Sequence, residues 1–400
     1  MSTIALITLL LCAQDTPNTR STATTQDVTQ DVTQEMVDAL SLKSYKVTLK
    51  QLTTFGDRRQ GTGRNRAALD WIEEEFSSYG YTNSQRLNYQ FPEATHTPHS
   101  ESQRLRPRGP EGAVGGGRRR GLRAPTGVNR DPKAQKNTKL RKLNMQPVID
   151  DQRQQIYCTK IGSSRPEEMY IIAAHMDGIG FGEACNDDGS GTAIVLELAR
   201  IFADPRVQTE CSVRFVLFNN EESGLNGSYA YVDQRHALQG IESPEDSGLY
   251  PEPKWLGMIQ HDMMLFDHGM PLADGTLPKE QRPEADVNVE YQWQSDHWQD
   301  SHKLAMAFQR ANERYATDYP AAVGAHMTNT DSVPFMDKVA CISLRENERG
   351  TQVGNGWNPH WHQVSDMFSS YSDDDFRLGL NAAQTTLAAV AKLSGARWVE

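Results

Sequence analysis

The stretch MYIIAAHMDGIGFGEACNDDGSG, residues 169–191, joins a short apolar run to an imidazole and three aspartates. The apolar run has the length of a buried strand and ends at His175 and Asp177. Asp187 and Asp188 follow among glycines, directly before a helical pattern. Carboxylates this close together repel one another in a cleft of low dielectric unless cations lie between them. The stretch therefore raises the question of which cations it binds.

Strand and helix patterns alternate from this stretch to the end of the chain. Apolar runs typical of strands occupy residues 156–162, 169–175, 212–220, 255–264 and 340–346. Helical patterns occupy residues 191–204, 226–238, 300–316 and 374–395. This order predicts an α/β three-layer sandwich, in which helices flank both faces of a mixed, mostly parallel sheet.

The region before the stretch adds two helical patterns and a strand. Residues 37–55 read as helical, residues 66–81 form a clear amphipathic helix with Gly80 as its stop signal, and residues 84–91 read as a strand. We expect residues 36–400 to form a single domain, preceded by a leader over residues 1–35.

The leader has two parts. Residues 4–11 resemble the apolar core of a secretory signal without its basic start, and residues 14–34 are polar and repetitive, typical of a flexible segment. We therefore expect an exported protein, periplasmic or extracellular. No run of about 18 apolar residues occurs, so we expect no transmembrane helix.

A basic insertion interrupts the predicted domain at residues 103–142. It holds 13 Lys and Arg residues against two Asp and Glu, with few large apolar side chains. Such a composition predicts a disordered surface insertion, with binding of nucleic acid or an acidic polymer as the alternative. The net charge of the whole chain is −11, which argues against nucleic acid as its main partner.

Side chains that bind metals follow each strong strand from residue 169 onward. In parallel sheets ligands bind outside the carboxyl ends of the strands, so these side chains are expected to converge. The groups at the strand ends and in the last loop are His175, Asp177, Asp187, Asp188, Glu221, Glu222, His261, Asp262, His360, His362 and Asp366.

Mixed histidine and carboxylate ligation suits zinc, and a bridging carboxylate allows two metal ions about 3.5–4 Å apart. Glu221 and Glu222 are adjacent at a strand end, where a turn can aim both toward the cleft. One of them can then bind metal while the other remains free as a general base.

Five linked motifs resemble those of the co-catalytic di-zinc aminopeptidases. They are AAHMDG, NDDGSGTA, NNEESGLNGS, IQHDMM and HQVSD, in the order and spacing of that family. The family belongs to the zinc exopeptidases, which also include glutamate carboxypeptidase and glutaminyl cyclase. The resemblance covers about residues 50–95 and 147–395, and leaves out the leader and the basic insertion.

The resemblance implies two zinc ions per chain and peptide substrates cleaved at the N-terminus. It implies that His175 and Asp262 bind one zinc ion, that Asp187 bridges both, and that Glu222 and His362 bind the other.

The resemblance further implies that Asp177 orients His175 and that Glu221 is the general base. Asp188 follows the bridging residue, and its side chain is not expected to bind metal.

Several alternatives stay open. The family spacing selects His362 over His360 as a ligand, and His261 is expected to be a structural or cleft residue. Arg345 either pairs with nearby acids or meets a substrate carboxylate, which would favour a glutamate-carboxypeptidase-like hydrolase. A glutaminyl-cyclase-like transferase would keep a single zinc ion. We expect Met263, Met264, Phe266 and Trp357 either to form apolar walls of a specificity pocket or to pack in the core.

Overall fold

A computed structural model describes residues 31–91, 128–148, 152–266, 287–346 and 358–399. Its helices are α1 (Val32–Asp38), α2 (Leu42–Leu52), α3 (Gly63–Tyr79), α5 (Thr138–Asn144), α6 (Gly191–Phe202), α7 (Asn226–Arg235), α8 (Trp298–Tyr315) and α9 (Asp373–Leu393). Its strands are β1 (Gln85–Gln90), β2 (Gln152–Lys160), β3 (Arg165–His175), β4 (Val207–Gln208), β5 (Cys211–Phe218), β6 (Lys254–His261), β7 (Val287–Glu290), β8 (Ala321–Gly324), β9 (Cys341–Arg345) and β10 (Arg397–Trp398).

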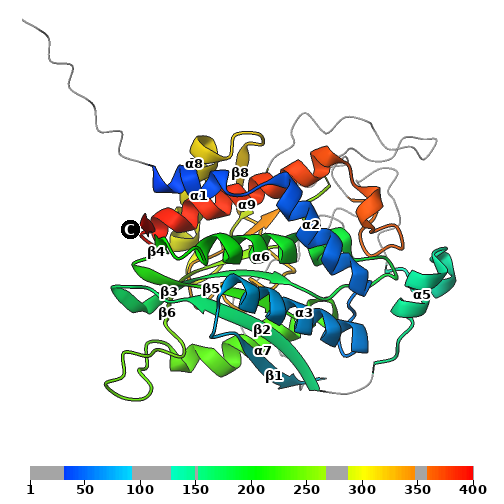
Figure 1. Cartoon of the computed structure of the whole chain (residues 1–400), viewed down its shortest axis with the longest axis horizontal. Coiled ribbons are helices and arrows are strands. Elements are labelled where there is room, and N and C mark those ends of the chain that lie inside the picture. Colours follow the sequence, from blue (N-terminus) through cyan, green and yellow to red (C-terminus); the bar gives the residue numbers. More distant parts are fainter. Residues whose placement is uncertain (1–30, 92–127, 149–151, 267–286, 347–357, 400) are drawn as a thin grey trace, which may run out of the picture. The chain divides into compact units, whose positions relative to one another are not determined.

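Eight of the described strands form one mixed sheet in the order β1-β2-β5-β3-β6-β9-β7-β8 (Figure 1). The central strands β5, β3, β6 and β9 run parallel to one another. Antiparallel pairing occurs between β1 and β2, between β2 and β5, and between β7 and β9. The parallel centre places the carboxyl ends of four strands along one edge of the sheet.

The residues of β3 and β5 alternate between two apolar cores, one on each face of the sheet. Ile172 and Phe215 pack into the core beneath α6, α8 and α9. Ile171 and Phe218 pack into the other core, to which α7 contributes Tyr231. Helices therefore cover both faces of the sheet, which confirms the predicted α/β three-layer fold.

The N-terminal helical pattern is divided in the structure. Helix α2 begins at Ser41, whose side chain accepts a hydrogen bond from the backbone N–H of Ser44. Helix α3 ends at Gly80, as predicted, with a left-handed backbone (φ 102°). The prediction of one continuous helix over residues 37–55 is therefore wrong at residues 39–41, because an N-cap serine starts a new helix there.

The prediction of a disordered insertion is wrong for residues 128–142. They are folded, with the short helix η2 (Pro132–Ala134) followed by α5. Asn137 caps α5 through its side-chain oxygen, which accepts hydrogen bonds from two backbone N–H groups. The remainder of the basic insertion, residues 103–127, lies outside the described residues, as do residues 1–30 of the predicted leader. The end of that leader, residues 32–35, belongs to α1 instead of a flexible segment.

Two further findings concern thiols and membranes. The four described cysteines are free and buried, namely Cys158, Cys185, Cys211 and Cys341. Across the ranges described above, every helix is too short or too polar to cross a lipid bilayer.

Candidate metal centre

Four segments meet at the carboxyl edge of the parallel strands, and the first of them runs from the end of β3 through the loop to α6. Because β3 pairs with both β5 and β6 in parallel, the residues that follow these three strands lie side by side. The loop between β3 and α6 and the loop of residues 358–366 complete the site. This is the position at which open α/β sheets bind their ligands.

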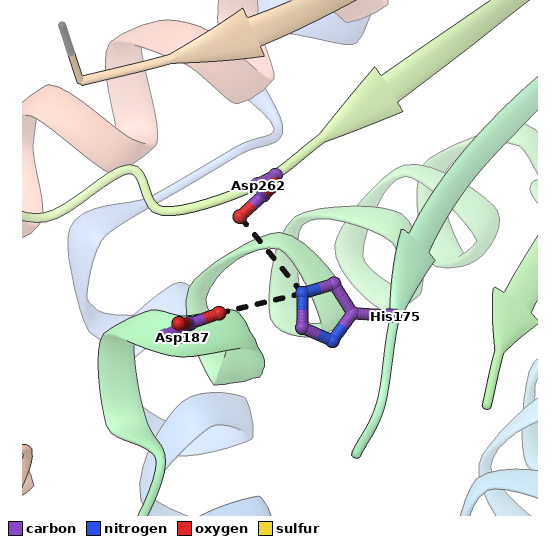
Figure 2. Close-up of side chains that lie close together, drawn as sticks. All are labelled: His175, Asp187 and Asp262. Atoms are coloured by element: carbon purple, nitrogen blue, oxygen red, sulfur yellow. Dashed lines mark ion pairs between the residues drawn. The ribbon is translucent and has the colours of Figure 1, made fainter. Parts of the chain in front are cut away.

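The first group of side chains consists of His175, Asp187 and Asp262 (Figure 2). The Nε2 atom of His175 lies 3.4 Å from Oδ1 of Asp187 and 3.9 Å from Oδ1 of Asp262. All three side chains are almost fully buried. Their ligand atoms lie within 4.8 Å of one another, which is close enough for one metal ion to contact all three.

The second group consists of Asp187, Glu222 and His362. The Nε2 atom of His362 lies 3.0 Å from Oδ2 of Asp187 and 2.8 Å from Oε2 of Glu222. Asp187 thus faces a different histidine with each of its two oxygens. This is the arrangement that a carboxylate shared by two metal ions requires. The ligand roles of these five residues stay predictions.

Asp177 connects His175 to Glu221. Its backbone oxygen lies 3.0 Å from Nδ1 of His175, and its Oδ1 lies 3.7 Å from the same nitrogen. The same Oδ1 accepts a hydrogen bond of 3.1 Å from the backbone N–H of Glu221. A partner on Nδ1 fixes the ring of a metal-binding histidine, so the predicted orienting role of Asp177 has a geometric basis.

Asp188 is buried and its carboxylate is occupied by the backbone. It accepts hydrogen bonds from the N–H groups of His175, Gly191 and Met263 at 3.2, 2.9 and 3.3 Å. These residues lie at the end of β3, at the start of α6 and just after β6. Asp188 therefore ties together the backbone of the elements that carry the first group.

Histidines and carboxylates shift one another's pKa across the site. Burial raises the pKa of Glu222 to about 7, and the nearby Asp187 carboxylate adds to the rise. Burial alone would lower the pKa of His362, but Glu222 and Asp187 raise it to about 11. Burial alone would raise the pKa of Asp262, but Arg345 and His175 together lower it to about 2.

Glu221 lies next to the second group and its carboxyl has a different environment. Burial raises its pKa well above the ordinary value for glutamate, and the neighbouring carboxylates of Glu222, Asp331 and Asp262 add to this effect. A pKa raised in this way is the property that a general base needs near neutral pH.

The structure describes the surroundings of His360 and His261, whose roles the sequence left open. The Nδ1 atom of His360 lies 2.9 Å from Oγ of Ser365, and its ring packs edge-to-face on Tyr371, away from the two groups. His261 is fully buried between the backbone oxygen of Ala173 and the hydroxyl of Thr386. Both histidines have structural surroundings.

Arg345 is buried and paired with acidic residues. Its Nη2 atom lies 2.8 Å from Oδ2 of Asp262, and its Nε lies 3.7 Å from Glu290. The same Nη2 also donates to the backbone oxygens of Thr328 and Asn329. The guanidinium is therefore committed to the protein itself and orients Asp262.

The three apolar residues that were expected after β6, as pocket walls or as core, are all buried. Met264 and Phe266 belong to the core beneath α6, and Met263 is also buried. Trp357 lies outside the described residues.

Arg58 is a buried residue that the sequence reading missed. Its guanidinium donates hydrogen bonds to the backbone oxygens of Met176, Gly56, Glu183 and Ala184. These contacts fix both ends of the loop between His175 and Asp187. Nothing in the sequence RRQGTGRN, residues 58–65, distinguishes the buried Arg58 from the exposed Arg59.

Comparisons with known proteins agree with this geometry. Residues 156–385, more than half of the chain, match peptidase family M28. Aminopeptidase YwaD of Bacillus subtilis is 38% identical over 78 residues, which are 18% of this chain and 17% of YwaD. The matched segments cover less than half of each of the first curated relatives.

Solved structures share the fold at low identity. A zinc aminopeptidase from Bacillus subtilis superposes with a TM-score of 0.56 and 18% identity, covering 88% of this chain and 95% of that one. Porphyromonas gingivalis glutaminyl cyclase gives a TM-score of 0.54 and 17% identity, covering 89% and 99%. The two histidine–carboxylate groups thus lie within the matched region, and the chain belongs to peptidase family M28.

Proposed function

We propose that this chain is a zinc-dependent aminopeptidase that removes N-terminal residues from peptides with two zinc ions. One observation carries the proposal. The two oxygens of Asp187 face Nε2 of His175 and Nε2 of His362 separately, and one further carboxylate completes each group. Family membership and the aminopeptidases among its relatives support the same reading.

The donor set fits zinc. Histidine nitrogens and carboxylate oxygens are ligands that zinc prefers, and the excess of buried carboxylates favours a pair of divalent cations. His175, Asp187 and Asp262 would hold one ion, and Asp187, Glu222 and His362 the other. The buried Oε1 of Glu222 accepts no hydrogen bond within the described residues, so it is available as a ligand atom. When bound, zinc supplies Lewis acidity at the scissile carbonyl and lowers the pKa of water.

Glu221 is the proposed general base. Its backbone is fixed by the hydrogen bond to Asp177, and burial favours the protonated form of its carboxyl. The carboxylate takes a proton from the attacking water and then returns it to the leaving amine. Asp177 keeps the imidazole of His175 in position throughout, because it contacts Nδ1 on the side away from Asp187.

The charge of the site favours cleavage at the amino end of a substrate. The excess of carboxylates attracts the positive α-amine of a free N-terminus. The carboxypeptidase alternative relied on Arg345 to bind a substrate carboxylate. That guanidinium is buried against Asp262 and Glu290 instead, which favours the aminopeptidase.

The test combines metal analysis with a substrate panel. The protein is loaded with zinc, its zinc content per chain is measured, and it is given free and N-blocked peptides. Two zinc ions and cleavage of free N-termini alone are expected. Cleavage restricted to N-blocked peptides would overturn the aminopeptidase assignment, and one zinc ion with cyclisation of N-terminal glutamine would favour the glutaminyl-cyclase-like alternative.

We also propose that the protein is exported. The support is the apolar run of residues 4–11, which resembles the core of a secretory signal. Fractionation of producing cells, with N-terminal sequencing of the recovered protein, tests this. A protein that stays with the cytosolic fraction and keeps its N-terminus contradicts it.

A further inference from the structure

Residues 128–148, here called the strap, run beside the candidate metal centre. The strap lies between β1 and β2 and contains η2 and α5. It carries six Lys and Arg residues and one Asp, and Leu140 is its one buried large apolar side chain. Apolar packing therefore cannot account for its fixed position.

Three carboxamides of the strap bind three consecutive carbonyls of the loop between β3 and α6. The side-chain nitrogens of Asn129, Gln135 and Asn144 donate to the backbone oxygens of Gly180, Phe181 and Gly182, at 3.0, 3.0 and 2.7 Å. Gln135 and Asn144 are buried, so these bonds are shielded from water. The loop that they fix also connects His175 with Asp187.

The strap also binds the loop that carries His362. The backbone N–H of Asn129 donates to the backbone oxygen of His362 at 3.0 Å. The Nε2 of Gln135, already bonded to Phe181, also donates to the backbone oxygen of Val364 at 3.1 Å. Gln135 thus joins the two loops through a single amide group.

The two loops touch each other mainly through backbone atoms. A Cβ atom on Gly180 would lie 2.4 Å from the backbone oxygen of His362, and one on Gly182 would lie 2.7 Å from that of Gln363. The backbone of His362 is itself left-handed (φ 56°). Direct hydrogen bonds join the two loops at Asp366, which accepts from the backbone N–H groups of Glu183, Asn186 and Asp187 at 2.7, 2.8 and 3.2 Å. The strap adds hydrogen bonds nearer to the metal-binding side chain, at His362 and Val364.

We propose that the strap is a positioning element of the metal centre, with Gln135 as its central residue. By joining the two loops, it holds His362 opposite Asp187 and Glu222. In this role the strap acts on the site through the backbone of the two loops. The metal-binding part of this inference rests on the proposed function, whereas the fixing of the loops does not.

The decisive variant is Gln135→Glu. It keeps the size of the side chain and an oxygen that accepts from the backbone N–H of Asn137. It loses the Nε2 amide group, which donates the hydrogen bonds to Phe181 and Val364 in the two loops. Gln146→Glu is the matched control, because it makes the same charge change in the same strap. Gln146 bonds to Arg64, and within the described residues it contacts neither loop.

Two measurements are made on the full-length protein and its variants. Zinc titration against a chromophoric chelator gives the affinity of each ion. Hydrogen–deuterium exchange of the chelated protein gives the protection of residues 178–183 and 358–366, without any metal.

For Gln135→Glu we expect one zinc affinity near that of the wild type and the other weakened about 10–100-fold, the range for groups that orient metal ligands. Exchange should accelerate in both loops, and Gln146→Glu should match the wild type. Should Gln135→Glu fail to fold, Asn129→Ala, which removes the single side-chain bond to Gly180, should show the same changes to a smaller degree.

Unchanged exchange and unchanged affinities in Gln135→Glu and Asn129→Ala would overturn the positioning role. An equal loss of affinity for both zinc ions, together with a lowered Tm, would also overturn it. The strap would then have a purely structural role. Fewer than two zinc ions in the wild type would instead count against the proposed function, and the exchange data would still decide on the strap.

Discussion

Two clusters of buried charge lie along β5 and differ in their balance. In the middle of the strand, the guanidinium of Arg214 pairs with Glu252 and also bonds to Thr159, Tyr231 and the backbone of Pro251. The Glu252 carboxylate accepts further bonds from Tyr231 and from Nε1 of Trp255. This cluster holds one cation and one anion, each surrounded by partners.

The cluster beyond the end of β5 is unbalanced. Asp187, Glu222 and Asp262 converge with two histidines, and the guanidinium of Arg345 pairs with Asp262. The carboxyl groups of Asp177, Asp188 and Glu221 lie beside them, so acidic groups outnumber basic ones at this site. Buried charges are tolerated when they are paired, so the balanced cluster needs nothing more. An excess of buried carboxylates, rather than burial of charge itself, therefore indicates a cation site.

Replacing a glutamate by glutamine should have different effects in the two clusters. In the unbalanced cluster, Glu221→Gln should lower kcat/KM about 10²–10⁴-fold, the usual contribution of a general base. Zinc content and Tm should stay near the wild-type values, because the variant removes a carboxylate from a crowded acidic site. Full activity in this variant, measured by peptide hydrolysis, would contradict the assignment of the base.

In the balanced cluster, Glu252→Gln should lower the free energy of unfolding by about 3–5 kcal/mol, because it leaves the buried cation of Arg214 unpaired. Activity per folded molecule should not change, since the pair is remote from the site. Urea unfolding of the chelated protein measures the effect. An unchanged unfolding midpoint would mean that the Arg214–Glu252 pair contributes no net stability.

Asp177→Asn probes a residue at the border of the unbalanced cluster. The amide keeps an oxygen for the backbone N–H of Glu221 but loses the charge beside Nδ1 of His175. Zinc affinity and kcat/KM are expected to fall about 10–100-fold, with little change in Tm. If neither quantity changes, His175 is held by the backbone oxygen of Asp177 alone.

His261 is a buried titratable group whose partners are neutral, so it contrasts with the histidines of the unbalanced cluster. Burial lowers its pKa to about 4, below the value of about 6.5 in an unfolded chain. Its contribution to stability is therefore complete above pH 6.5 and is lost as the pH falls toward 4. His261→Gln should reduce the pH dependence by up to about 1.4 kcal/mol per pH unit in this range. The free energy of unfolding is measured for the chelated wild type and variant from pH 7 to pH 4. Parallel plots of this free energy against pH would contradict the prediction.

Periodic patterns in the sequence were sufficient to predict six of the eight strands of the sheet and the longer helices that cover it. They also brought the candidate ligands to one edge, because parallel strands place their carboxyl ends together. The short strands β7 and β8 have four residues each, too few for a pattern to emerge. Sequence periodicity thus predicts elements that bury many apolar side chains.

The strap could not be predicted for the opposite reason. Its composition is basic and poor in large apolar residues, which is typical of disorder. What orders it is a set of hydrogen bonds from Asn129, Gln135 and Asn144 to distant carbonyls. Arg58 escaped prediction similarly, since its partners are backbone oxygens of residues more than a hundred positions away as well as of Gly56. Contacts to the main chain leave no trace in a pattern of side chains.

Because the strap binds backbone carbonyls, some side chains of the loop that it binds are free to change in sequence. The strap recognises the carbonyl of Phe181 and not its ring, so position 181 can accept other side chains without losing the bond from Gln135. Gly180 and Gly182, pressed against the neighbouring loop, cannot vary in this way. Directed evolution of this loop should therefore randomise residue 181 and leave both glycines and the three amides unchanged.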